Sequence, residues 1–96
     1  MNLTSYHLRV EAKTKRRIKP KVMRKAILHL AKIMKMKTLG EMVIYEGTGI
    51  AGFTGFQIIE TSHLAFHHFQ DKKESLLWLD ILSCEWISYD NVVDYL

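Results

Sequence analysis

Apolar and polar positions divide the chain into short alternating segments and one helical segment. From Tyr6 to Glu11 the side chains alternate between the two kinds, as in a strand with one buried face. Further along, apolar residues recur at the three- and four-residue spacing of a helix that buries one stripe. They are Val22, Met23, Ala26, Ile27, Leu30, Ile33 and Met34. Pro20 suits the first turn of that helix, where a missing N–H breaks no hydrogen bond, so we expect a helix from Pro20 to Met36.

The rest of the chain predicts four more strands and a closing helix. The strand segments are rich in aromatic and branched residues and are separated by polar or glycine-rich breaks. They cover residues 42–45, 53–59, 64–69 and 76–84, and the closing helix covers residues 90–96. The order strand, helix, four strands, helix predicts an α+β fold, a two-layer sandwich with helices on one face of a mainly antiparallel sheet. We expect residues 1–96 to form a single domain.

The composition is that of an ordinary globular protein, with 48% hydrophobic and 25% charged residues. No apolar run approaches the roughly 18 residues of a membrane span, so we expect no membrane partner. Met1–Val10 lack the apolar stretch of a secretory signal, and the single cysteine, Cys84, fits a reducing compartment. We therefore expect a cytoplasmic protein. Because a chain this short buries a small share of its surface, we also expect a homodimer.

The net charge of +4 hides a strong asymmetry along the chain. Residues 1–37 hold 12 of the 14 Lys and Arg with one acid, Glu11, whereas residues 38–96 hold 2 basic and 9 acidic residues. A basic half can bind nucleic acid, an anionic membrane or an acidic partner, and it can equally be a solvated helix face. We favour the solvated face and do not expect a nucleic-acid partner, because no recognised nucleic-acid motif accompanies the segment Lys13 to Lys25.

The residues with the most chemistry follow one another at fixed spacings in the second half of the chain. A hydroxyl-glycine pair precedes an apolar strand, a serine-histidine pair stands eight residues later, and a second histidine, an aromatic residue and an Asp-x-x-x-Cys segment follow. In order they are Thr54-Gly55, Ser62-His63, His67, Phe69 and Asp80 to Cys84. This pattern is similar to that of the prokaryotic S-adenosylmethionine decarboxylase family, whose members depend on a pyruvoyl group.

The resemblance implies that the chain cuts its own backbone between Thr61 and Ser62. Ser62 would attack the carbonyl of Thr61, and the resulting ester would eliminate to leave a pyruvoyl cofactor derived from Ser62. Thr54 matches the hydroxyl residue that assists this step, and His67 matches the histidine that removes the Cα proton of the serine. Cys84 matches the thiol that returns a proton to the product carbon.

The resemblance also implies a small-molecule substrate, S-adenosylmethionine, decarboxylated for polyamine (spermidine) biosynthesis. The pyruvoyl carbonyl would form a Schiff base with the substrate amine and act as an electron sink. His63, Phe69 and Asp71 fall where the family has residues near the substrate, and a sulfonium cation beside an aromatic face and a carboxylate is electrostatically favourable. Because this chemistry needs only an α-amino acid, arginine and ornithine stay alternative substrates.

The main alternative is an unprocessed, catalytically inactive relative that acts as a binding or regulatory protein. Thr61 stands where the family has a glutamate, and Glu85 stands where it has a glycine. The chain also stops at Leu96, inside what would be the family's second helix, so we expect its final strand to be missing. The changed Thr61 and the short C-terminus favour this alternative.

Individual residues also have simpler interpretations. Thr61 and Ser62 can be the polar turn of a hairpin, and Cys84 can be a small buried residue. His63 and His67 share one face of a strand, which raises the question of a metal, but one cysteine and no well-spaced acid accompany them. We therefore predict no metal site.

Overall fold

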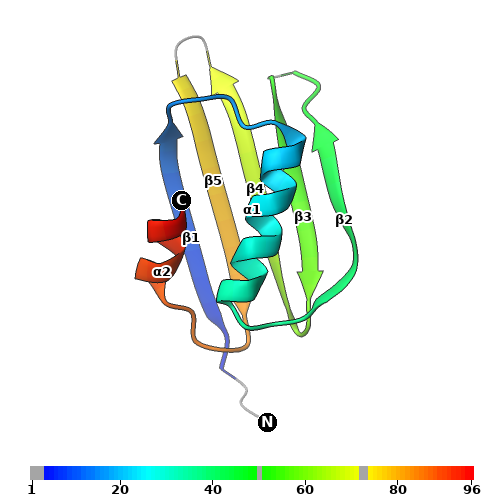
Figure 1. The fold of residues 1–96 in the computed structure, drawn as a ribbon, viewed down its shortest axis with the longest axis vertical. Helices are drawn as coiled ribbons and strands as arrows, with labels where there is room; N and C mark the ends of the chain where they lie inside the picture. Colours follow the sequence, from blue (N-terminus) through cyan, green and yellow to red (C-terminus); the bar gives the residue numbers. More distant parts are fainter. Residues whose placement is uncertain (1–3, 50, 72–73) are drawn as a thin grey trace.

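The computed structural model describes residues 4–49, 51–71 and 74–96. Within these residues it contains five strands and two helices in the predicted order, which confirms the α+β fold. The elements are β1 (Tyr6–Thr14), α1 (Pro20–Ile33), β2 (Thr38–Glu46), β3 (Gly52–Ile59), β4 (Ser62–Asp71), β5 (Glu74–Ser83) and α2 (Tyr89–Tyr95). Both helices lie on one face of the sheet, as predicted (Figure 1).

The five described strands form one antiparallel sheet in the order β1-β5-β4-β3-β2. Consecutive strands from β2 to β5 are antiparallel neighbours, as in a series of hairpins. The segment that contains α1 instead crosses from the edge strand β1 to the other edge strand, β2, and carries the helix over the sheet (Figure 1). β4 therefore lies at the centre of the sheet, with β3 and β5 on either side.

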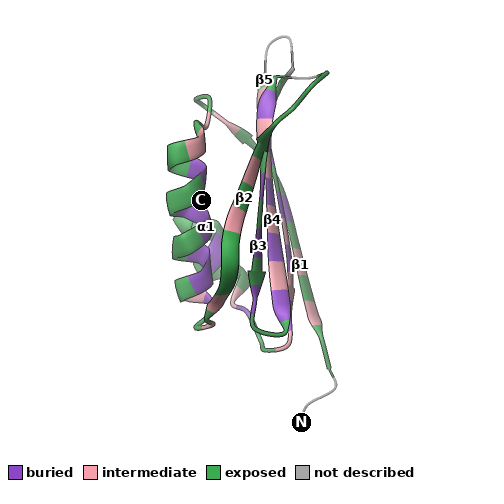
Figure 2. Cartoon of the chain, turned by 90° about the vertical axis from the view of Figure 1, so that its right-hand side faces the viewer, coloured by how far each residue is buried: buried purple, intermediate pink, exposed green. Residues whose placement is uncertain are grey.

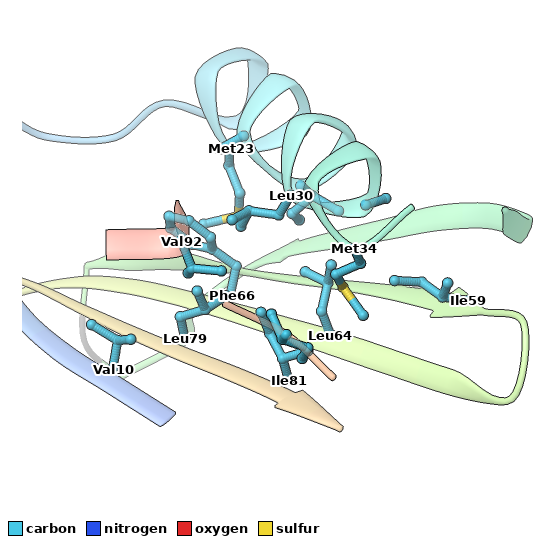
Figure 3. Close-up of a cluster of buried hydrophobic side chains, with 14 of the residues drawn as sticks. Val10, Met23, Leu30, Met34, Ile59, Leu64, Phe66, Leu79, Ile81 and Val92 are labelled. Atoms are coloured by element: carbon cyan, nitrogen blue, oxygen red, sulfur yellow. The ribbon is translucent and has the colours of Figure 1, made fainter. Parts of the chain in front are cut away.

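The core lies between α1 and the sheet. The side chains of Met23, Ile27 and Leu30 are fully buried along the inner side of α1. They pack over alternate residues of β4 and β5, among them Leu64, Phe66, Leu79 and Ile81 (Figure 3). Burying one large aliphatic side chain contributes about 1.5–3 kcal/mol, so this contact between layers is the main source of stability.

Three details differ from the predicted pattern. Val22 was expected in the buried stripe but is 55% exposed, because it lies on the outer side of α1. The helix ends at Ile33, three residues before the predicted end, and Lys35 adopts a φ of 57° just beyond it. β2 is longer than predicted, because ladder pairing extends it over polar residues and across an irregularity between Leu39 and Val43.

The helix approaches the sheet closely at Gly55, in the middle of β3. A Cβ at this position would lie 2.7 Å from Ile27 Cδ1 and 2.9 Å from Met23 Sδ, closer than packed atoms normally come. Successive residues of a strand point to opposite faces, so the neighbouring Thr54 points away from the helix. The hydroxyl-glycine pair thus has one residue on each side of the sheet.

The face of the sheet opposite the helices, which we call the open face, is covered by no described helix or strand (Figure 2). Large apolar side chains alternate onto it and are only partly covered. They are Tyr45, Phe56, Ile58 and Trp78. Exposed apolar patches usually mark an interface or a ligand site.

Helix α2 packs beside α1. Ser88 caps it by accepting a hydrogen bond from the Asn91 N–H at 3.3 Å, and Val92 is fully buried. The rings of His29 and Tyr95 stack between the two helices with their centroids 4.0 Å apart. Among the described residues, no helix is long and apolar enough to cross a membrane.

Candidate active site

The turn between β3 and β4 holds a residue in an unusual backbone conformation. Thr61 has a φ of 52°, in the left-handed region. A β-branched residue rarely adopts this region, because its Cβ crowds the neighbouring carbonyl at a cost of roughly 1–2 kcal/mol. Ser62 follows as the first residue of β4 and pairs with Ile59 across the hairpin. Backbone strain therefore lies immediately before the predicted nucleophile.

The hydroxyl of Ser62 is held by two neighbours from distant parts of the chain. It accepts a hydrogen bond from the Cys84 N–H at 3.1 Å and donates to Met36 Sδ at 3.4 Å. Only 8% of the residue is exposed. Neither neighbour is a base, so the contacts that the structure describes orient the hydroxyl without providing a group to take its proton.

The side chains of Thr61 and Cys84 also meet at this turn. Thr61 Oγ1 lies 2.8 Å from Cys84 Sγ and 2.7 Å from the carbonyl oxygen of Glu60. A hydroxyl has one proton to donate but can also accept, so it donates to one of these partners at a time. When it donates to Glu60, a protonated Cys84 thiol can donate to Thr61 Oγ1. Three predicted residues, Thr61, Ser62 and Cys84, thus form one cluster, which we call the cleavage turn.

Two other predicted residues form a separate pair on the open face. Thr54 on β3 stands opposite His67 on β4, and Thr54 Oγ1 lies 3.0 Å from His67 Nδ1. We call them the hydroxyl–histidine pair. They line a hollow of about 400 Å³ next to two aromatic rings, Phe69 and Trp78, whose centroids are 4.7 Å apart. The hollow is mostly apolar, and the pair provides polar groups in its wall.

The cleavage turn and the hydroxyl–histidine pair do not meet within one chain. Ser62 and His67 are five residues apart on β4, which at about 3.3 Å per residue separates them by roughly 16 Å along the strand. The predicted base for the elimination step therefore cannot reach the predicted nucleophile of the same chain without a large rearrangement of the central strand.

The three residues predicted to bind substrate, His63, Phe69 and Asp71, do not form one group in the structure. Phe69 lines the hollow described above. His63 is half-buried on the open face, where its ring lies 5.6 Å from the ring of Phe56. The backbone of Asp71 pairs with Glu74 at the end of β4, and its side chain lies outside the described part of the structure.

Two residues, Met36 and His7, make contacts that were not predicted from the sequence. The sulfur of Met36 accepts from the hydroxyl of Ser62 at 3.4 Å and lies 3.8 Å from the hydroxyl oxygen of Ser83. Met36 stands 26 residues before Ser62 and was predicted only as the last residue of the helix. No local sequence pattern therefore indicated its contact with Ser62. His7 Nε2 contacts a carboxylate oxygen of Asp80 between neighbouring strands, and only Asp80 belonged to the motif.

His68, which follows His67 on β4, points into the core. Its Nε2 accepts the Ile18 N–H at 3.1 Å, and its buried Nδ1 has no hydrogen-bond partner among the described residues. Burial lowers the pKa of His68 below its ordinary value of 6.5, and the charge of Arg17 acts in the same direction, whereas a backbone contact with Leu76 opposes it. A neutral imidazole thus ties the segment between β1 and α1 to the centre of the sheet.

The electrostatics near the cleavage turn are acidic. Glu60 precedes Thr61 and Glu85 follows Cys84, and both carboxylates are exposed. Carboxylates close to a site favour a cationic ligand over an anionic one. Within the described residues, no three His, Cys, Asp or Glu side chains come together as a metal site would require.

Comparison with known proteins adds one match. The sequence model of the S-adenosylmethionine decarboxylase family matches residues 7–96, which includes both residue groups of the site. Neither the curated proteins nor the solved structures contain a match to the chain.

Proposed function

The chain belongs to the S-adenosylmethionine decarboxylase family, and from that premise we propose that it is a pyruvoyl-dependent decarboxylase that makes its own cofactor. Its proposed substrate is S-adenosylmethionine, decarboxylated for polyamine (spermidine) synthesis. The observation that carries the proposal is the strained Thr61 directly before a buried, oriented Ser62 hydroxyl. Strained backbone at a turn is often part of a mechanism, because the reaction can release it.

In the first proposed step, Ser62 Oγ forms a bond to the carbonyl carbon of Thr61. The bond between that carbon and the Ser62 nitrogen breaks, and the hydroxyl proton ends on the freed nitrogen. The product is an ester in place of an amide. The Cys84 N–H, 3.1 Å from Oγ, stabilises the negative charge that develops as the hydroxyl loses its proton. Opening the amide also releases Thr61 from its strained φ.

In the second proposed step, His67 takes the Cα proton of Ser62. The Cβ–Oγ bond breaks, and Thr61 leaves as the carboxylate end of the first fragment. Water then replaces the nitrogen of the remaining unsaturated residue, releasing ammonia and leaving a pyruvoyl group before His63. The contact between Thr54 Oγ1 and His67 Nδ1 leaves Nε2 of the histidine free to act as the base.

Because His67 lies far from Ser62 of its own chain, we propose that a second copy supplies it. Packed through their open faces about a twofold axis that crosses β4 midway between Ser62 and His67, two copies would bring the cleavage turn of each to the hydroxyl–histidine pair of the other. The partly exposed apolar side chains of that face, such as Ile58 and Trp78, support such a homodimer. Phe56, which is also partly exposed, lies on the same face.

For decarboxylation, the pyruvoyl group would supply the electron sink that the loss of CO₂ from an α-amino acid requires. Cys84 would return a proton to the carbon that loses CO₂, since its sulfur already lies at the cleavage turn. The aromatic rings of Phe69 and Trp78 suit a sulfonium cation, which is attracted to aromatic faces. Arginine and ornithine, which are also cationic, are the alternative substrates.

A second candidate is an unprocessed relative that acts as a binding or regulatory protein. One observation favours it: the described partners of the Ser62 hydroxyl, Met36 and Cys84, include no base. Thr61, which replaces the family's glutamate, points the same way. This candidate keeps the strained turn but predicts that the chain stays whole.

The intact mass of the purified protein tests the proposal. Self-cleavage predicts one fragment that ends at Thr61 and a second with a blocked, pyruvoyl start, whereas the unprocessed alternative predicts a single mass of 11.2 kDa. Ser62→Ala should abolish cleavage, because it removes the nucleophile. Ser83→Ala is the matched control, since it removes a buried hydroxyl that contacts the same Met36 sulfur.

Release of CO₂ from labelled substrate tests the activity itself. S-adenosylmethionine, arginine and ornithine are compared with the cleaved protein and with Ser62→Ala. If the chain stays whole after long incubation at mildly alkaline pH and releases CO₂ from none of them, the enzyme proposal fails and the binding-protein candidate replaces it.

A further inference from the structure

Positive charge is concentrated between the last residues of β1 and the start of β2. Residues 13–37 contain eleven Lys and Arg and no Asp or Glu, and all eleven are exposed. The densest part covers the connection before α1 and the first turns of its outer side, which Figure 2 shows as exposed. We call it the basic surface: Arg16, Arg17, Lys19, Lys21, Arg24 and Lys25.

Among the residues that the structure describes, these cations have no acidic partners. The ion pairs that the described residues form are Lys13 with Glu74, Arg9 with Glu11 and His7 with Asp80, and none involves the basic surface. The first turn of α1 also lacks an acidic side chain. Like charges at neighbouring helix positions repel one another, so the surface is electrostatically unfavourable until an anion neutralises it.

The packing of α1 distinguishes between two kinds of anionic partner. A basic helix that binds a membrane inserts its apolar face into the lipid. Here that face is already used, because Met23, Ile27 and Leu30 are fully buried against the sheet. The outer side offers only the isolated apolar residues Val22 and Leu28 among its charges. The surface can therefore contact anions but cannot insert.

We propose that the basic surface binds nucleic acid through the phosphate backbone, without reading the base sequence. An arginine side chain can contact a phosphate through two parallel N–H groups. Three of the six residues of the basic surface are arginines: Arg16, Arg17 and Arg24. No aromatic residue belongs to the surface, so it offers charge without a stacking platform. The proposal departs from the sequence-based preference for a purely solvated face, and it does not rest on the decarboxylase proposal.

The position of the surface leaves the candidate active site accessible. Figure 1 shows the connection before α1 at the upper end of the molecule and the turn between β3 and β4 at the lower end. A bound nucleic acid would lie on the helix side of the sheet, away from the open face. Cleavage at Ser62 should therefore proceed at the same rate with and without nucleic acid.

Fluorescence anisotropy with a labelled 20-base-pair DNA duplex of arbitrary sequence tests the proposal. For roughly four phosphate contacts, raising the salt from 50 to 200 mM should weaken binding about a hundredfold. A second duplex of unrelated sequence should bind within about twofold of the first. The double variant Arg16→Glu with Arg24→Glu should raise Kd at least about tenfold and lower the salt slope by about 2.

The matched control is Lys35→Glu with Lys37→Glu, which changes the net charge equally at the other end of α1. It should keep Kd within about threefold of the wild type, and circular dichroism should show that both variants are folded. The proposal is overturned if both variants weaken binding equally, which would indicate a net-charge effect. Absence of duplex binding at 50 mM salt, or binding only to phosphatidylserine vesicles, also overturns it.

Discussion

Among single residues, Thr61 connects backbone conformation to the proposed chemistry most directly. Its φ of 52° is unfavourable for a β-branched residue but acceptable for glycine. If cleavage releases this strain, Thr61→Gly should slow cleavage about tenfold, the equivalent of roughly 1.4 kcal/mol. The fraction of intact mass over time measures the rate.

The control for this prediction is Thr61→Ala. It removes the hydroxyl near Cys84 but keeps a Cβ, and so retains most of the backbone strain. Thr61→Ala should therefore cleave faster than Thr61→Gly. Equal rates for the two variants would show that the strain does not contribute.

His68 makes the stability of the fold depend on pH. Its pKa is lowered in the folded protein, mainly by burial, so the unfolded chain binds a proton more readily. As pH falls below about 6.5, the unfolded state gains protons first and the free energy of unfolding decreases, until the folded ring also protonates. Urea unfolding at pH 7.5 and pH 5 measures the difference.

The matched variant is His68→Gln, whose side-chain oxygen can still accept the Ile18 N–H but does not titrate. It should lose less stability on acidification than the wild type. An identical loss in both proteins would assign the effect to the other histidines.

Between elements, the contact of α1 with β3 depends on Gly55. Gly55→Ala should destabilise the fold by about 1–2 kcal/mol, since the new methyl group must displace side-chain ends of Ile27 and Met23 in a close-packed core. Gly49→Ala is the control, because nothing lies within 4 Å of its Cβ position. Urea unfolding of both variants checks the prediction, and equal stability would contradict it.

The elements themselves were predictable because their periodic patterns are local. The alternation in the strands and the apolar stripe on α1 both arise because one side of each element is buried. For this reason all seven elements were predicted in the correct order. Val22 was placed wrongly, since it extends the stripe in sequence but faces outward. The extra length of β2 depends on its pairing with β3. The local pattern of apolar and polar residues holds no information about that pairing.

The site was predictable only as far as its residues lie on one hairpin. The spacing of Thr54, Ser62 and His67 identified a motif, and the hairpin pairing sets Thr54 opposite His67. The roughly 16 Å between Ser62 and His67 follows from the length of a strand, whereas the resemblance assigned both residues to one reaction without indicating this distance. Met36 reaches Ser62 from the connection between α1 and β2, a contact that only the folded chain creates.

At the scale of the whole molecule, a site shared between two chains predicts complementation. Chains with Ser62→Ala and chains with His67→Ala should each fail to cleave alone. When the two are co-expressed, the Ser62→Ala chain still provides His67, so the His67→Ala chain should be cut. Mass spectrometry distinguishes the two chains.

The control pairs His67→Ala chains with the double variant Ser62→Ala with His67→Ala, and no cutting is expected there. Complementation that fails, together with sedimentation of a monomer at micromolar concentration, would contradict the shared site. Cleavage of the wild type in that monomeric form would show instead that the central strand rearranges.

The strand order has a consequence for a chain cut between residues 61 and 62. The second fragment would contain β4 and β5, which lie between β3 and β1 of the first fragment. The two pieces would stay together as a noncovalent complex, since separating them requires breaking the ladders on both sides. Refolding would then become a bimolecular reaction, so the melting temperature of the cut protein would rise with its concentration even if the uncut chain melted as a monomer. One broken peptide bond would thus convert a self-contained fold into an assembly that depends on mass action.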